Sequence, residues 1–520
     1  MDTNRIKTIL ILAVATFGAL YLGVSAATAQ FETIAWIIGG TGLSICLLLG
    51  KKIWMIIPFM SVLNLSLIIP TRPDTGLLSQ AIFLGFCTLL FLMRKLPFRI
   101  AFTELGFWTA LIATCVLQTY IRNPVGLNII GGESVGAKPY VLFGAALVTS
   151  VLLSTYKISP TDLKWILRLS IIGGILNFTL LAIGTLVPRL GVWYGAVGGG
   201  EVNSTGQQTG AYGAEGATRI VFVRDFGRNL SLWIGSFKSP IRACFHPVSA
   251  PLVLISLACA AFSGYRSEVA AVGFTYLVAI SYRGGMVAVV VSCLSLAMGI
   301  VMLSVINLAT PLPVNIQRSL SFLPGTWDQA LTEDAEQSTE WRVKMWEEAL
   351  LTDFWIKNKL LGDGLGMTRQ EYNFIRSFGD KQISGGVGSG DISQQQEFFM
   401  ASGAYHSGPV STIRAIGYAG LLILLIAQIR LAVHAHRQIQ RTRNTEWFPL
   451  ALFVGIPLIW SPFFFVLIFG TFSSGATSFL LGSAWVRVLE NNLPLPLYVI
   501  QRRTPYILQQ RRTTSDTSSQ

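Results

Sequence analysis

Apolar segments of about 20 residues recur along most of this chain, and each is about as long as a helix must be to cross a bilayer. A soluble domain would have to bury many helices that are apolar on every side, which is not how globular proteins are built. Only 12% of the residues are charged and the mean hydropathy is +0.56, whereas soluble domains carry about 25% charged residues. The sequence therefore predicts an all-α, polytopic membrane protein.

The net charge of +13 lies mainly in the short gaps between the apolar segments. This distribution follows the positive-inside rule, by which cytoplasmic loops collect Lys and Arg. It explains the basic character of the chain without a nucleic-acid partner, and we expect none. The gaps hold Lys51, Lys52, Arg94, Lys95, Arg99, Lys157, Lys164, Arg168, Arg437, Arg441 and Arg443, and the tail adds Arg502, Arg503, Arg511 and Arg512.

Apolar segments and basic gaps together predict about 14 transmembrane helices, a total of about 12–14 being in keeping with the pattern, and both termini in the cytoplasm. The first segment has features of a signal peptide, but its length favours an uncleaved helix. We expect helices near 7–27, 33–50, 53–69, 77–93, 101–120, 139–155, 169–187, 219–237, 247–264, 267–281, 286–306, 411–429, 447–468 and 473–489.

The least certain of these helices, 219–237, carries Arg224, Asp225 and Arg228. Charges in a span usually face a bundle interior or a cavity, so this segment is either such a helix or a loop. If it does not span, every later segment changes side. With it as a span, the chain divides into N-terminal helices (1–187), central helices (188–306), a periplasmic loop (307–409), C-terminal helices (410–489) and a basic cytoplasmic tail (490–520).

The hydrophilic loop 307–409 is the part of the chain where we expect chemistry. Residues 338–362 have a helical pattern, with Ser338 as the predicted N-cap. One face of this helix collects Trp341, Met345 and Ala349. The stretch "LLGDGLG" that follows lacks the Lys-Ser/Thr pair of a phosphate-binding loop, and we interpret it as a helix stop and a turn.

His406 is the one histidine that this topology puts outside, because His246, His434 and His436 fall at the inner edge or in an inner loop. The six cysteines all lie in or beside apolar segments, so the sequence predicts no disulfide scaffold, no metal site and no cofactor. A histidine near neutral pH can take a proton from a sugar hydroxyl. Arg266 and Arg342, on the same predicted side, supply the forked donors that a lipid diphosphate needs.

The loop and its flanking helices resemble the O-antigen ligase and O-antigen polymerase superfamily over roughly residues 245–430. The resemblance rests on "WRVKMW" with Arg342, on "GDGLG", and on "YHSGPVSTIRAIGYAG" with His406, Gly417 and Gly420. It also rests on "SGYRSEVAAV" with Arg266, although Tyr265-Arg266-Ser267 stands where the family has Ser-Arg-Gly. Ser407 replaces a frequent Asn, and Ala415-Ile416 replaces a frequent acidic residue. Arg283, in "YRGG", is a rival for the role of Arg266, but the predicted topology puts it inside.

This resemblance implies a GT-C-like enzyme of the bacterial inner membrane that transfers a glycan from an undecaprenyl diphosphate carrier with inversion and without a metal. It implies His406 as the base and Arg266 and Arg342 on the donor diphosphate, with Tyr405 and Arg414 as supporting residues. A ligase would use lipid A core as acceptor, and a polymerase would use a second lipid-linked glycan. The sequence does not separate the two. A lipid-linked glycan transporter or flippase is the alternative of another class; charges deep in several helices and an internal repeat, typical of transporters, are not evident.

Overall fold

The computed structural model describes residues 48–63, 75–94, 103–126, 136–186, 218–368 and 405–493, with isolated positions at 40–46, 208–209, 370–373, 400 and 403. The predicted helix 7–27 lies outside these residues, as does most of 33–50. In the described part the chain is helical apart from one two-residue antiparallel pair, β1 (Gln208–Thr209) with β2 (Thr218–Arg219).

Seven of the described helices are long and apolar enough to cross a membrane, namely α4, α5, α6, α7, α13, α18 and α19. This is the architecture expected of a helical membrane protein, while the predicted total of about 14 spans remains a prediction. The elements are η1 (Gly50–Met55), α3 (Ile56–Met60), α4 (Thr75–Leu92), α5 (Glu104–Arg122), α6 (Lys138–Thr155), α7 (Pro160–Leu186), α10 (Val221–Phe237), α11 (Pro240–Cys244), α12 (Ser249–Phe262), α13 (Arg266–Ala309), α14 (Val314–Leu320), α15 (Gln329–Leu351), α18 (Gly408–Thr442), α19 (Phe448–Leu467) and α20 (Phe472–Asn492).

Most predicted helices agree with the structure to within a few residues. The helix predicted at 53–69 is instead the short pair η1 and α3, which ends at Met60, and the helix predicted at 411–429 extends to Thr442 in α18. The two segments predicted at 267–281 and 286–306 are joined in α13, which is broken at Gly285 with φ 76° and ψ −175°. Helix α7 begins at Pro160 rather than at 169, and so takes in basic residues that were assigned to a gap. One of these, Lys164, pairs with Glu446 at 2.9 Å, which lets a charged residue extend the end of an apolar helix.

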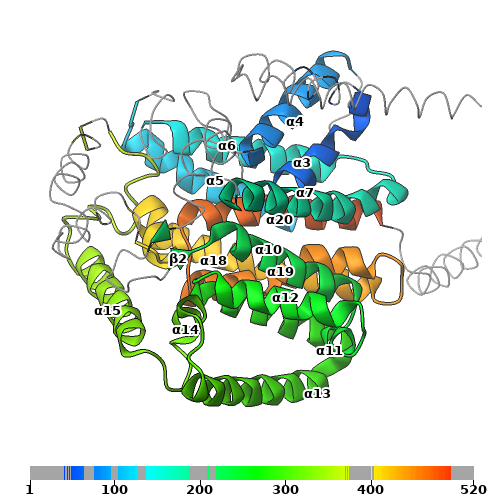
Figure 1. Cartoon of the computed structure of the whole chain (residues 1–520). Helices are drawn as coiled ribbons and strands as arrows, with labels where there is room; N and C mark the ends of the chain where they lie inside the picture. Colours follow the sequence, from blue (N-terminus) through cyan, green and yellow to red (C-terminus); the bar gives the residue numbers. More distant parts are fainter. Residues whose placement is uncertain are drawn as a thin grey trace, which may run out of the picture.

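Helices α7, α10, α12, α18, α19 and α20 lie side by side, so the bundle that they form has two ends (Figure 1). We name them the His406 end, after the residue just before α18, and the His434 end, after a residue within α18. Residues of several basic gaps meet at the His434 end, where Lys52 pairs with Asp162 at 2.8 Å, Tyr156 donates to the Lys51 carbonyl at 2.7 Å and Lys164 pairs with Glu446 at 2.9 Å. Basic gaps that are far apart in the sequence therefore lie together at one end of the bundle, as the positive-inside rule leads us to expect.

Helix α10 settles the secondary structure of the segment 219–237, which is a helix and not a loop. Ile220 donates its N–H to the Ser263 carbonyl at 3.0 Å at the His406 end, and Gly235 accepts from Arg283 Nε at 3.1 Å at the other end. The helix packs closely on α12, since a Cβ added at Gly227 would lie 2.9 Å from Cys259 Cβ. Its charged residues lie in its first two turns. Figure 1 shows α10 beside its neighbours α7 and α12.

The apolar core lies between the helices in two main clusters. One centres on Trp54, Leu163 and Trp233, and joins η1, α7 and α10. The other centres on Ile112, Leu424 and Phe479, and joins α5, α18 and α20. Burial of these side chains between helices fixes the positions of the helix ends that carry the candidate site.

The loop helix differs from its prediction. Helix α15 begins at Gln329, with Asp328 as the N-cap whose carboxylate accepts from the Ala330 N–H at 2.9 Å, so Ser338 lies inside the helix and is not its cap. It ends at Leu351, before Thr352 becomes extended. The predicted common face of Trp341, Met345 and Ala349 is confirmed, and it is the buried face, because Met345 and Ala349 are fully buried and Trp341 packs with them.

Candidate functional site

His406 has a left-handed backbone, with φ 51°, directly before α18. Among the described residues only Arg94 is another non-glycine with positive φ. Such a conformation costs on the order of 1 kcal/mol or more and persists only where the surroundings impose it. The half-buried imidazole lies between two aromatic rings, 6.3 Å from Trp341 and 5.8 Å from Phe469. The fold therefore fixes the orientation of the imidazole ring and leaves part of it exposed.

The residues on either side of His406 hold it in place. Tyr405 is fully buried among Met345, Val410 and Ile413, and its carbonyl accepts from Trp346 Nε1 at 2.7 Å. Ser407 caps α18. The short segment is therefore fixed both to α15 and to α18.

Tyr405 is close to the site but is chemically inert near neutral pH. Burial raises the pKa of its phenol to about 12, and its hydroxyl donates to the Met400 carbonyl at 3.3 Å. A phenol with such a pKa stays protonated at physiological pH and cannot serve as a base there. The structure leaves Tyr405 a supporting role through packing.

Arg342 lies on α15, next to a residue that contacts His406. Its neighbour Trp341 makes the ring contact with His406, and the Arg342 side chain is half-buried. The "WRVKMW" segment therefore contacts the His406 segment through Trp341, and the role of Arg342 stays a prediction.

Arg414 lies two turns into α18, with its guanidinium against Gly403, where a Cβ would overlap it. Tyr405 is within electrostatic reach of this charge. Within the part of the chain that the structure describes, the Arg414 side chain makes no ion pair. Arg414 is thus a half-buried cation near Tyr405, a position from which a guanidinium can bind an anionic ligand.

Arg266 is the first residue of α13, at the His406 end. Helices α13 and α19 run in opposite directions and contact through Phe274 and Phe463, whose rings are 5.1 Å apart. From that contact, Arg266 and Phe469 both lie further toward the His406 end. Arg266 and His406 thus share an end of the bundle.

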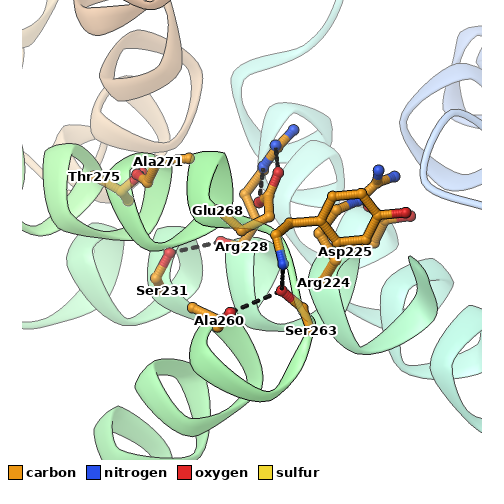
Figure 2. A network of polar contacts seen from close by, with 10 residues as sticks. Arg224, Asp225, Arg228, Ser231, Ala260, Ser263, Glu268, Ala271 and Thr275 are labelled. Atoms are coloured by element: carbon orange, nitrogen blue, oxygen red, sulfur yellow. Dashed lines mark hydrogen bonds and ion pairs between the residues drawn. The ribbon is translucent and has the colours of Figure 1, made fainter. Parts of the chain in front are cut away.

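A polar network surrounds the start of α13 (Figure 2). Arg228 reaches from α10 to Glu268, with Nε 2.9 Å from one carboxylate oxygen and Nη2 bonded to the other. Arg224 pairs with Asp225 at 2.8 Å and lies 5.0 Å from the Tyr265 ring. The charges that made 219–237 an uncertain span are thus paired, and Glu268 neutralises Arg228 next to Arg266.

Arg283, the rival of Arg266, lies at the His434 end, opposite to Arg266. It donates to the carbonyls of Gly235 and Ser236 at the end of α10 and stacks on Phe448 at 5.0 Å. Its guanidinium satisfies carbonyls that a helix end leaves free. This geometry gives Arg283 a capping role, remote from His406.

The sequence did not predict the contacts that the "LLGDGLG" stretch makes with α18. Helix α18 is broken at Gly417, with φ 76° and ψ 179°. At the break, Asp363 and Gly364 donate their N–H groups to the carbonyls of Arg414 and Ala415 at 2.6 and 3.1 Å. In return, the N–H groups of Tyr418 and Ala419 donate to the carbonyls of Lys359 and Leu360 at 2.8 and 3.3 Å. We call this exchange of four backbone hydrogen bonds the clasp.

Other helices hold the clasp from behind. Gln118 Nε2 and Arg122 Nη2 of α5 donate to the Leu361 carbonyl at 2.7 and 3.2 Å, and the Leu365 N–H donates to the Tyr140 hydroxyl of α6 at 3.0 Å. The Asp363 carboxylate accepts from the N–H groups of Lys357 and Asn358. The spacing of the glycines was the signal in the sequence for this unusual backbone, because Gly362 and Gly364 both have positive φ.

His434 lies at the opposite end of the bundle, in a cluster with two glutamates. His434 bridges Glu490, at 2.8 Å from Nδ1, and Glu104, at 3.1 Å from Nε2, and Arg430 also pairs with Glu104. Within the described residues, no group of three or more His, Cys, Asp or Glu side chains is arranged to hold a metal ion.

No protein-family profile matches this chain, and no curated protein matches it.

Proposed function

We propose that this chain is a membrane glycosyltransferase of the O-antigen ligase type, which moves a glycan from an undecaprenyl diphosphate carrier to an acceptor hydroxyl. The observation that carries the proposal is His406, a half-buried imidazole held in a strained backbone between two rings. Strain of this kind is stored where a function needs a fixed geometry. Arginines on α13, α15 and α18 lie at the same end.

In the proposed reaction, His406 takes the proton of the acceptor hydroxyl as that oxygen attacks the anomeric carbon. The bond from this carbon to the diphosphate oxygen breaks, with inversion, and undecaprenyl diphosphate leaves. Arg266 and Arg342 hold the departing diphosphate, and Arg414 adds the third cation. Forked donors in a site with little water stabilise the charge that develops on the leaving group. No step uses a cofactor.

The proposed setting is a bacterial inner membrane, with the His406 end and loop 307–409 in the periplasm and both termini in the cytoplasm. The collection of basic residues at the His434 end supports this orientation. The acceptor is lipid A core in a ligase and a second lipid-linked glycan in a polymerase. Glycans of a deletion strain separate the two. Single units on the lipid core indicate a polymerase, and unattached long chains indicate a ligase.

The test of the site is a pair of substitutions assayed with purified donor and acceptor. His406→Asn keeps a residue that tolerates the left-handed backbone but removes the base. Transfer should fall by about 10²–10⁴-fold, the usual contribution of a positioned base, while the melting temperature stays near that of the wild type. His246→Ala, at an exposed histidine of the opposite end, is the matched control. Near-normal transfer by His406→Asn refutes the proposed base.

Transport of a lipid-linked glycan is the second candidate, because α13 and α18 are both discontinuous. Broken helices are a recurring feature of transporter binding sites. Here, however, the groups freed at Gly417 bond to the loop rather than being open to a substrate. Liposomes that contain the purified protein decide the matter. Movement of labelled lipid-linked glycan across the bilayer, with no new glycosidic bond in the presence of acceptor, selects the transporter.

A further inference from the structure

The segment 351–361, between α15 and the clasp, exposes large apolar side chains. The exposed fractions are 80% for Leu351, 70% for Phe354 and 64% for Leu360, and Leu361 is also exposed. We call these four residues the apolar rim. Contiguous exposed apolar surface of this kind marks an interaction site. The question is what covers it.

The apolar rim is held together as one unit. An ion pair between Lys359 and Asp353 ties the two ends of the segment. The Phe354 ring packs on Trp355 with centroids 4.7 Å apart, and Trp355 Nε1 donates to Glu348 at 2.9 Å. The rim therefore has a fixed position on the loop.

The apolar rim continues the outer surface of two candidate spanning helices. The Leu361 carbonyl is bonded to Gln118 and Arg122 of α5, and the Leu360 carbonyl is bonded to the Ala419 N–H of α18. The neighbouring outward side chains on these helices are large and exposed, namely Leu117, Ile121, Tyr418 and Leu422. Since α5 and α18 are long and apolar enough to cross a membrane, those side chains face lipid.

The residues around the apolar rim suit the boundary between lipid and water. Trp355 has an apolar body and a polar edge, which is the character of residues found at membrane interfaces. Exposed Lys357 lies in the same segment, where an ammonium group can meet anionic headgroups. The partner that fits this surface is the bilayer in which the helices sit.

We propose that segment 351–361 inserts the apolar rim into the headgroup and upper acyl region of the leaflet at the His406 end. The loop is then attached to the membrane surface at that point, and α15, with Trp341 against His406, is held at the depth of lipid headgroups. This inference is independent of the proposed glycosyl transfer, because it depends on exposure and continuity alone.

The test places a benzophenone-bearing amino acid at Phe354 in the full-length protein, reconstituted in vesicles of phosphatidylethanolamine and phosphatidylglycerol. After irradiation, the mass of the intact protein reports lipid adducts. The same amino acid at Leu422 is the positive control, and at exposed Lys344 of α15 the negative control. The native cysteines need no change in this design.

The expected result is a lipid-adduct yield at 354 comparable to that at 422 and far above that at 344. A yield at 354 as low as that at 344, with normal adducts at 422, overturns the proposal, because the rim then lies in water. Cross-links from 354 to a second copy of the chain also overturn it, since the rim would then be an interface between copies.

Discussion

Gly417→Ala tests whether the clasp fixes the first part of α18. The backbone at Gly417, with φ 76° and ψ 179°, lies in a region that is essentially restricted to glycine. A Cβ there would overlap the Leu360 carbonyl and lie 2.5 Å from the Leu361 N–H nitrogen. The obstacle is backbone rather than a flexible side chain, so the contact cannot relax by a rotamer change.

The cost follows from the four hydrogen bonds of the clasp. Strain at a glycine-only conformation is about 1–3 kcal/mol if the structure is kept. Opening the clasp instead loses four backbone hydrogen bonds, each with a net value of about 0.5–1.5 kcal/mol, so about 2–6 kcal/mol in all. Because a Cβ cannot fit against the Leu360 carbonyl, we expect Gly417→Ala to open the clasp.

The assay is amide hydrogen exchange of purified protein in detergent, read on peptides that contain 359–364 and 414–419. Both peptides should exchange faster in Gly417→Ala, and the melting temperature should fall. Gly273→Ala in α13 is the matched control, because nothing lies within 4 Å of its added Cβ. Gly362→Ala should have the same effect as Gly417→Ala, and the double variant little more, because both open one contact. Unchanged protection of both peptides in Gly417→Ala would refute the reasoning.

Three further outcomes are expected. Tyr405→Phe should leave the pH dependence of activity near neutrality unchanged. Since the folded pKa of Tyr405, about 12, exceeds the usual value of about 10, the wild type should lose more stability than this variant as the pH rises from about 10 toward 12, as thermal melts of both proteins at each pH will show. Glu268→Gln should destabilise the protein in denaturation by about 1–3 kcal/mol, and not more, because the Arg228 side chain is 40% exposed. Cysteine at Glu340 should react with an impermeant reagent added to the periplasmic side and cysteine at Gln440 should not, relative to the unmodified chain; the reverse pattern contradicts the topology.

The helices were predictable from the sequence because apolar length is a local property. Segments such as 139–155 and 447–468 need only a count of apolar residues between basic gaps, and the structure has α6 and α19 there. Helix α15 was less predictable. Its first half is polar, so no apolar period marks its start, and Ser338 looked like a cap although Asp328 is the residue that caps it.

The clasp could not be predicted because it joins backbone groups that are distant in sequence. Asp363 and Arg414 contribute an N–H and a carbonyl, which every residue other than proline has, so the bond leaves no signature in the side chains. Only the glycines at 362 and 417 pointed to an unusual backbone, and nothing in the sequence paired them. The closeness of Trp341 to His406 was likewise a matter of tertiary packing.

The break at Gly417 divides α18 into two parts with different attachments. The short part, 408–416, follows His406 and carries Arg414, and its free carbonyls are bonded to the loop. The long part holds His434 and is tied to Glu104 and Glu490 at the other end. An unbroken helix would couple His406 rigidly to the whole bundle. With the break, the short part is held on one side by α15 and the clasp. On the other side Gly408 packs against Phe465 of α19, and the Ser411 hydroxyl accepts from the Phe472 N–H of α20 at 3.1 Å. The loop and the bundle together therefore set the geometry of the candidate site.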